Sequence, residues 1–269
     1  MTTQTLELPD GARIAYTDTG TGRPILLLHG VCMSRRFFGR NVEPLARDHR
    51  VIAVDFRSHG DSAPVEGGHT VAQYARDVRA LLEHLDLTHV TAVGWSMGSF
   101  VLWDYIAQFG EDRLSSVVVV SQGPSDLTQL DWPYGIADIP GLRGYLGGMQ
   151  DNFRAFFTGF TPLMFKNELS PGELAGFVDA ICQVGANAGT LIFVDQTLKD
   201  YRGKVAGYKI PHCLVWGSDE KVIKLGSGQW LASSLPEAEY VVFEESGHCP
   251  MWEEAGKFNT LVANWVSRH

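Results

Sequence analysis

Val90-Thr91-Ala92-Val93-Gly94-Trp95-Ser96-Met97-Gly98 is the stretch that decides the fold of this chain. Its first four residues form an apolar run typical of a buried strand, and its last five match Gly-x-Ser-x-Gly. An apolar helical pattern follows from Phe100 to Ile106. A strand, a sharp turn and a helix together hold a serine side chain at the strand tip in a strained backbone conformation. We therefore predict that Ser96 is a nucleophile; without this context, Gly-x-Ser-x-Gly would be an ordinary glycine-rich turn.

The length and composition of the chain are typical of a globular protein. It has 269 residues, of which 45% are hydrophobic and 20% charged, and this suits one large domain or one domain with an insertion. The formal net charge is −9 and no cluster of Lys or Arg is present, so we expect no nucleic-acid partner and no membrane binding. The expected partner is a small-molecule substrate, and a homo-oligomer is left open.

The cysteines and the N-terminal residues predict a cytoplasmic protein with reduced thiols. The four cysteines are scattered and show no C-x-x-C spacing, which argues against a structural zinc site and against a disulfide framework. Residues 1–9 contain neither a basic region nor a long apolar run, so we expect no signal peptide. No stretch is long enough to span a bilayer. Neither a metal nor a cofactor is expected.

Strand and helix patterns alternate along most of the chain. An N-terminal hairpin is predicted at residues 6–8 and 13–18, followed by strands at 24–28, 51–54, 90–93, 117–120, 213–217 and 240–243. Helices are predicted at 37–47, at 71–85 with Thr70 as the cap, from the elbow to 109, at 230–235 and at 251–266. Repeated strand–helix units imply a mostly parallel, doubly wound α/β sheet of about eight strands.

The alternation stops between residues 123 and 207. This segment is rich in aromatic residues and is interrupted by glycine and proline, which predicts irregular helices that form a lid. The expected organisation is therefore a core domain from 1–122 and 208–269, with a helical lid inserted at 123–207.

The groups suited to catalysis all follow predicted strands. Ser96 follows one strand, His29-Gly30-Val31 a second, Asp219 and Glu220 a third, and His248 a fourth. Active sites of such sheets gather at the carboxyl ends of the strands. The order of nucleophile, acid and histidine along the chain is the order found in one family of hydrolases.

Nearly the whole chain resembles the α/β-hydrolase superfamily, most of all the small lidded esterases, lactonases and cofactor-free haloperoxidase-like members. The segments that carry this resemblance are His29-Gly30, Asp55 to Ser62, Gly94 to Gly98, Gly217 to Glu220 and Gly247-His248. Residues 247–253 also resemble the corresponding segment of the meta-cleavage hydrolases, which break carbon–carbon bonds.

The chemistry of acyl transfer assigns roles to these residues. His248 would accept the Ser96 proton, and a carboxylate would orient the imidazole. The backbone N–H groups of Val31 and Met97 would form the oxyanion hole. The family pattern Gly-x-x-Asp, counted from Gly217, predicts Glu220 as the acid.

Two other carboxylates are alternatives to Glu220 as the acid. Asp219 is one residue earlier, and adjacent residues of an extended loop point in opposite directions. Asp126, after the preceding strand, is a remote third candidate.

Aromatic residues of the lid and residues near the elbow are predicted to bind an apolar substrate. The residues assigned to this role are Trp95, Cys32, Trp132, Tyr134, Phe156 and Phe157. Neither Cys32 nor Cys249 has a base positioned by sequence, so a cysteine nucleophile is not expected.

The sequence favours a serine hydrolase that cleaves an ester or lactone with an apolar or aromatic part. Three alternatives stay open: carbon–carbon hydrolysis, a cofactor-free haloperoxidase-like activity, and a non-catalytic receptor on the same scaffold. Serine at position 96 argues against the epoxide hydrolases and haloalkane dehalogenases of this fold, which have aspartate there.

Overall fold

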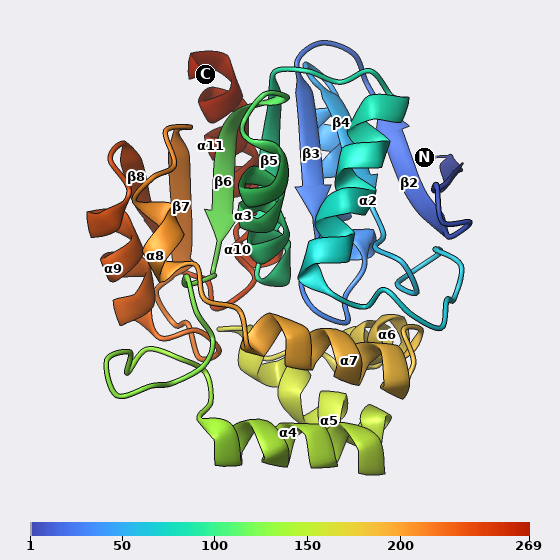
Figure 1. Ribbon diagram of the computed structural model, residues 1–269, viewed down its shortest axis with the longest axis vertical. Helices are drawn as coiled ribbons and strands as arrows, with labels where there is room; N and C mark the ends of the chain where they lie inside the picture. Colours follow the sequence, from blue (N-terminus) through green and yellow to red (C-terminus); the bar gives the residue numbers. More distant parts are fainter. Residues whose placement is uncertain (1) are drawn as a thin grey trace.

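An eight-stranded sheet forms the centre of the computed structural model, which describes residues 2–269 (Figure 1). The strands lie in the order β1-β2-β4-β3-β5-β6-β7-β8, with only the pairs β1–β2 and β2–β4 antiparallel. Their bounds are β1 Thr3–Glu7, β2 Arg13–Thr19, β3 Pro24–Leu28, β4 Arg50–Val54, β5 Val90–Trp95, β6 Leu114–Val120, β7 His212–Gly217 and β8 Ala238–Phe243. The predicted α/β fold, with a mostly parallel sheet of about eight strands, is confirmed.

Helices connect the strands and cover the sheet. Their bounds are η1 Arg35–Phe38, α1 Val42–Leu45, α2 Val71–His84, α3 Met97–Phe109, α4 Ile139–Asp151, α5 Phe153–Phe160, η2 Thr161–Met164, α6 Pro171–Cys182, α7 Ala186–Thr197, α8 Arg202–Val205, α9 Leu225–Ser234, α10 Pro250–Glu253 and α11 Ala255–Arg268. Helix α2 begins where the Thr70 hydroxyl accepts a hydrogen bond from the Gln73 N–H, as the sequence predicts.

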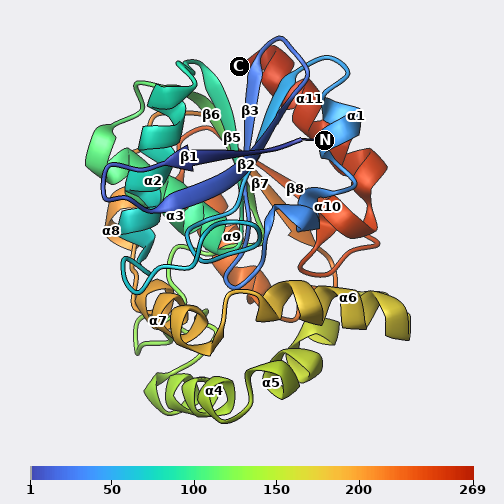
Figure 2. The ribbon, with the colours of Figure 1, turned by 90° about the vertical axis from the view of Figure 1, so that its right-hand side faces the viewer.

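The continuous apolar runs lie in the middle of the sheet because both of its faces are covered. In β3, the side chains from Ile25 to Leu28 are completely buried, and alternate ones face opposite sides of the sheet. Helices α2, α3 and α9 cover one face, whereas α1 and α11 cover the other (Figure 2). Each face therefore has its own apolar core, separated by the sheet.

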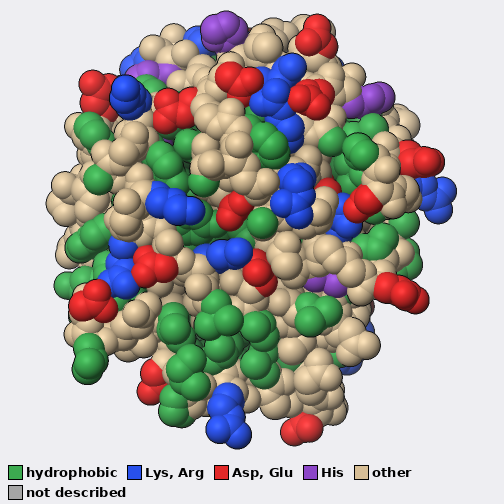
Figure 3. All heavy atoms as spheres, in the orientation of Figure 1, with side chains coloured by type: hydrophobic (Ala, Val, Ile, Leu, Met, Phe, Trp, Pro, Cys, Tyr) green, Lys and Arg blue, Asp and Glu red, His purple; other side chains and the backbone are tan. Residues whose placement is uncertain are grey.

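Helices α4 to α7 form a separate layer at one end of the sheet. The chain leaves the sheet after β6 and returns at β7, and the arrowheads of β3 and β6 point toward this layer (Figure 1). Hydrophobic side chains remain visible on its outer surface in the lower part of Figure 3. At the end of the insertion, α8 packs on the core, where the Tyr201 hydroxyl donates to Asp104. We call α4 to α7, with η2, the cap.

Two predicted helices are each divided in the structure. In place of the helix predicted at 37–47, the chain forms the short elements η1 and α1, which are separated by a turn at residues 39–41. The C-terminal helix breaks at Glu254, which has non-helical backbone angles. At this break, the carboxylates of Glu253 and Glu254 turn to the loop that follows β8 and accept hydrogen bonds from Gly247 and Ser246.

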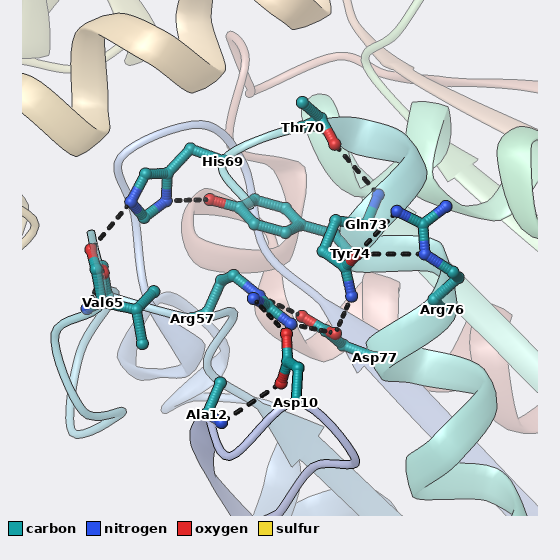
Figure 4. A network of polar contacts seen from close by, with 11 residues as sticks. Asp10, Ala12, Arg57, Val65, His69, Thr70, Gln73, Tyr74, Arg76 and Asp77 are labelled. Carbon is teal, nitrogen blue, oxygen red and sulfur yellow. Dashed lines mark hydrogen bonds and ion pairs between the residues drawn. The ribbon is translucent and has the colours of Figure 1, made fainter. Parts of the chain in front are cut away.

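A buried ion pair joins the loop after β4 to helix α2 and extends to the turn of the N-terminal hairpin (Figure 4). Arg57, in the loop after β4, donates two hydrogen bonds to Asp77 of α2, and both side chains are more than 95% buried. The same guanidinium also contacts Asp10 in the turn between β1 and β2. Three segments that are distant in sequence are therefore linked through one side chain.

None of the individual helices within residues 2–269 has the length and apolar composition needed to cross a membrane. Helices α6 and α7 meet these criteria only when taken together, as a pair bent by 85°.

Candidate active site

Ser96 lies at the sharp turn between β5 and α3. Its backbone angles, φ 51° and ψ −122°, belong to a strained region that non-glycine residues rarely adopt. Glycine is required on both sides of it. A Cβ at Gly94 would lie 2.6 Å from the carbonyl carbon of Gly98, and a Cβ at Gly98 would clash with the carbonyl oxygen of Leu28. The turn therefore has the shape that the sequence predicts for a nucleophile elbow.

His248 lies in the loop after β8 and is held from several sides. Its Nδ1 is 2.9 Å from Glu220 Oε2, and the two side chains are 3% and 0% exposed. Its backbone N–H donates to the Met164 carbonyl of the cap, and its carbonyl accepts from the indole of Trp95. The imidazole is thus fixed between the core, the cap and a buried carboxylate.

Glu220 is the carboxylate that the fold directs to His248. Its second oxygen, Oε1, accepts the backbone N–H groups of Val222 and Ile223 at 2.8 and 3.1 Å. Asp219 turns the other way: its side chain is 40% exposed and forms an ion pair with Lys221 at 2.7 Å. The two neighbouring acids therefore face opposite directions, as expected for an extended loop.

Asp126, the third candidate acid, does not bind the histidine. Its buried carboxylate accepts hydrogen bonds from the side-chain amides of Gln122 at 2.7 Å and Gln196 at 2.9 Å. Burial raises the pKa of Asp126 to about 6, against the opposing effect of these two hydrogen bonds.

The backbone approaches Ser96 closely at Gly30. A Cβ at Gly30 would lie 3.3 Å from the Ser96 Cβ, a tight contact that glycine avoids. The next residue, Val31, lines the cavity beside Ser96. Within residues 2–269, no hydrogen bond takes up the N–H of Val31 or that of Met97 at the start of α3. Both backbone donors named by the sequence therefore have no partner among these residues, but of the two residues only Val31 lines the cavity.

Ser96 and His248 open on one cavity of about 220 Å³ between the core and the cap. Its wall is largely apolar and aromatic. The lining side chains supplied by the cap are Tyr145, Phe156, Phe157, Phe160, Leu163, Met164, Phe193 and Gln196, and the core adds Met33, Trp95, Ile136, Val222 and Ile223 among others. Two lysines, Lys221 and Lys224, also line it. Such a cavity suits a small molecule with a substantial apolar part.

Three of the six predicted substrate-binding residues lie elsewhere. Trp95, Phe156 and Phe157 line the cavity, but Cys32, Trp132 and Tyr134 do not. The Cys32 side chain is completely buried and directed toward the Gly189 carbonyl, and burial raises the pKa of its thiol.

Trp132 and Tyr134 belong to the loop after β6 and pack on the core. The Trp132 ring stacks edge-on against Trp230 of α9, and the Tyr134 ring lies over Gly226 of the same helix. The prediction assigned them to the substrate pocket from the aromatic content of the segment alone. Their actual position follows from the packing of this loop on α9.

The sequence interpretation missed most of the pocket-forming residues. Tyr145, Phe160 and Phe193 belong to the aromatic cap that the composition indicates, but nothing local shows that they face inward. Gln196 was missed altogether, because a glutamine on a cap helix is indistinguishable from a solvated one by sequence pattern.

Comparisons with known proteins identify the family and the fold. The family model described as "Alpha/beta hydrolase family" matches residues 25–261. A non-heme haloperoxidase of Rhodococcus erythropolis is 38% identical over 234 residues, which cover 84% of this chain and 85% of that protein. A 2-hydroxy-6-oxononadienedioate/2-hydroxy-6-oxononatrienedioate hydrolase of Dechloromonas aromatica is 26% identical, over 95% of this chain and 91% of that protein.

Among solved structures, an esterase of Exiguobacterium antarcticum superposes with a TM-score of 0.95. It covers 99% of this chain and 100% of its own at 22% identity, a level at which the likeness establishes the fold alone. The family match, the relative at 38% identity and the strained serine turn lead to one conclusion. The chain belongs to the alpha/beta hydrolase family.

Proposed function

We propose that this protein is a serine hydrolase that cleaves a carboxylic ester or lactone with an apolar part. The observation that carries the proposal is that one apolar cavity is lined both by Ser96, in its strained backbone conformation, and by His248, which is hydrogen-bonded to Glu220. A serine hydroxyl needs a base to become a nucleophile at neutral pH, and an imidazole oriented by a carboxylate supplies one.

The reaction proceeds through an acyl-enzyme. Ser96 Oγ attacks the carbonyl carbon while its proton passes to the imidazole of His248. The negative charge that develops on the carbonyl oxygen is stabilised by the N–H groups of Val31 and Met97. The C–O bond to the leaving group breaks, and His248 returns the proton to that oxygen. Water then repeats the sequence, giving the carboxylic acid and free Ser96.

The glutamate contributes through orientation and charge. Since its Oε1 is held by two backbone N–H groups, Oε2 stays directed at Nδ1, which leaves Nε2 of His248 to exchange protons. A completely buried carboxylate also stabilises the imidazolium that forms in each half-reaction.

The alternative of carbon–carbon hydrolysis rests in the sequence on residues 247–253, chiefly Trp252. That side chain is not among the residues that line the cavity. It packs edge-on against Phe177 and lies under the guanidinium of Arg40, with the guanidinium carbon 4.2 Å from the ring centre. The position of Trp252 is thus accounted for by packing, and this residue gives carbon–carbon hydrolysis no support at the cavity.

Labelling with a fluorophosphonate tests the proposal. Wild-type protein should be labelled at Ser96, and Ser96→Ala should abolish the label. Ser99→Ala is the matched control because Ser99 lies one turn along α3, with its hydroxyl bonded to the Gly94 carbonyl. Labelling that persists in Ser96→Ala, or is absent from a folded wild type, would contradict the assignment.

A series of 4-nitrophenyl esters tests the apolar cavity. Each buried methylene adds about 0.8 kcal/mol of transfer free energy, so kcat/KM should rise about fourfold per carbon from two to four acyl carbons. A profile that is flat or falls over this range would exclude an apolar site for the acyl chain.

A further inference from the structure

Gln196 contributes a buried amide to the wall of the cavity. This side chain of α7 is 2% exposed, and its Nε2 donates to Asp126 Oδ2 at 2.9 Å. Because a carboxylate accepts and cannot donate, the amide nitrogen must be the atom that faces Asp126. The other amide atom, Oε1, is buried and accepts no hydrogen bond from any residue between 2 and 269.

Asp126 fixes the orientation of this amide from outside the cavity. It follows β6, is 1% exposed, and is held on its other oxygen by Gln122 at 2.7 Å. Gln122 binds the same carboxylate but does not line the cavity, whereas Gln196 does. A buried carboxylate thus holds one amide of the cavity wall with its acceptor oxygen turned away from Asp126.

A buried carbonyl oxygen without a partner destabilises the folded protein, and most such atoms in proteins are paired. The cavity that Gln196 lines is otherwise largely apolar, with Ile136, Tyr145 and Phe193 among its wall residues. A ligand that brings an O–H or N–H into this cavity would supply the missing donor. A purely apolar ligand would leave the oxygen unpaired.

We propose that Gln196 is a specificity-determining residue whose Oε1 accepts a hydrogen bond from a hydroxyl or secondary amide of the substrate. Asp126 is the positioning residue that holds the amide in this orientation. The inference rests on the proposed ester hydrolysis and narrows it to esters and lactones that carry such a donor beside an apolar group.

Two matched ester pairs test the inference. Methyl 3-hydroxybutanoate and methyl 3-methylbutanoate differ by hydroxyl against methyl, and methyl N-acetylglycinate and methyl 4-oxopentanoate differ by N–H against CH₂. For each pair, the measured quantity is the kcat/KM of the ester with the donor divided by the kcat/KM of the ester without it. For at least one pair, this ratio should be about tenfold lower in Gln196→Met than in the wild type, because a neutral hydrogen bond contributes a free energy on this scale. Comparing ratios between enzymes cancels the intrinsic reactivity of the esters.

A second variant covers the case in which Gln196→Met does not fold. In Asp126→Asn the new amide can donate to Gln196 Oε1, so the glutamine can turn its nitrogen to the cavity, and the ratio should again fall. Gln150→Met is the matched control, since Gln150 is an exposed cap glutamine bonded to Thr190. Its ratio should equal that of the wild type.

The outcomes separate the two proposals. If wild-type protein hydrolyses both members of each pair, and the ratios are unchanged in Gln196→Met and Asp126→Asn, the role of Gln196 is wrong and the esterase proposal stands. If wild-type protein hydrolyses none of the four esters, nor the 4-nitrophenyl series, both proposals fail.

Discussion

Replacing Glu220 by glutamine tests the geometry around His248 most directly. The side chain keeps its size, and its remaining carbonyl oxygen can still accept from the N–H groups of Val222 and Ile223. The loop should therefore keep its shape. What changes is the atom that faces Nδ1 of His248, because an NH₂ group donates where the carboxylate oxygen accepted.

The expected loss is large because the change acts on both the tautomer and the charge. A donor opposite Nδ1 favours the imidazole with its proton on Nε2, where it cannot accept the Ser96 proton. Amide replacement of such a carboxylate typically lowers kcat by about 10⁴-fold. The Glu220 side chain is completely buried, so solvent would not compensate for the missing charge.

Asp219→Asn is the matched control. The Asp219 carboxylate is 40% exposed and pairs with Lys221, a contact of little energetic consequence at a surface. Its kcat should stay within about threefold of the wild type.

The assay is kcat and KM at neutral pH on the best 4-nitrophenyl ester, with circular dichroism to check that each variant is folded. A larger loss in Asp219→Asn, or less than a tenfold loss in a folded Glu220→Gln, would refute the reasoning.

The remaining predictions concern the nucleophile and its base, the buried acid Asp126, and the buried ion pair of Arg57 and Asp77. Ser96→Ala and His248→Ala should each remove nearly all esterase activity with the fold intact. The double variant should have scarcely lower activity than either single variant, because the two residues act as a unit. A loss of less than tenfold in kcat in both single variants would exclude Ser96 and His248 as nucleophile and base. The pKa of Asp126 is about 6 in the folded protein, against an ordinary value of 3.8. Its contribution to stability is therefore complete below about pH 4 and lost as the pH rises through 6, amounting to about 3 kcal/mol. Urea unfolding of wild type and Asp126→Asn should show a stability difference that changes between pH 4 and 6 and is flat above 7; a difference independent of pH would argue against a raised pKa. Asp77→Ala leaves the Arg57 guanidinium buried without its main partner (Figure 4) and should cost about 3–5 kcal/mol in urea unfolding at pH 7. A loss below 1 kcal/mol would show that the pair does not stabilise the fold.

The sequence by itself determined the sheet and the serine turn. Runs such as Ile25 to Leu28 are apolar at every position, and a short run of this kind is typical of a strand covered on both faces. The glycines on either side of Ser96 follow from local steric limits that act within a few residues. Ser96, Glu220 and His248 each follow a strand in the sequence. Since the carboxyl ends of parallel strands lie at the same edge of the sheet, all three residues are expected there.

The contacts within the loops were decided by the tertiary structure. The counting from Gly217 favoured Glu220 over Asp219, but the direction of the carboxylate depends on the N–H groups of Val222 and Ile223 that hold it. Likewise, the carboxylates of Glu253 and Glu254, at the break between α10 and α11, bind the loop that holds His248. Helical periodicity in the sequence does not show these contacts.

The lining of the pocket was also decided by the tertiary structure. Trp132 and Phe157 belong to the same aromatic segment, yet the first packs on α9 and the second lines the cavity. An aromatic residue is buried equally well in either place, so its type indicates burial and not the partner. The same holds for Gln196, whose role follows only from Asp126, 70 residues earlier in the chain. Periodicity and steric limits act over a few residues, whereas the pocket is assembled from segments that only the packing of the cap on the sheet brings together.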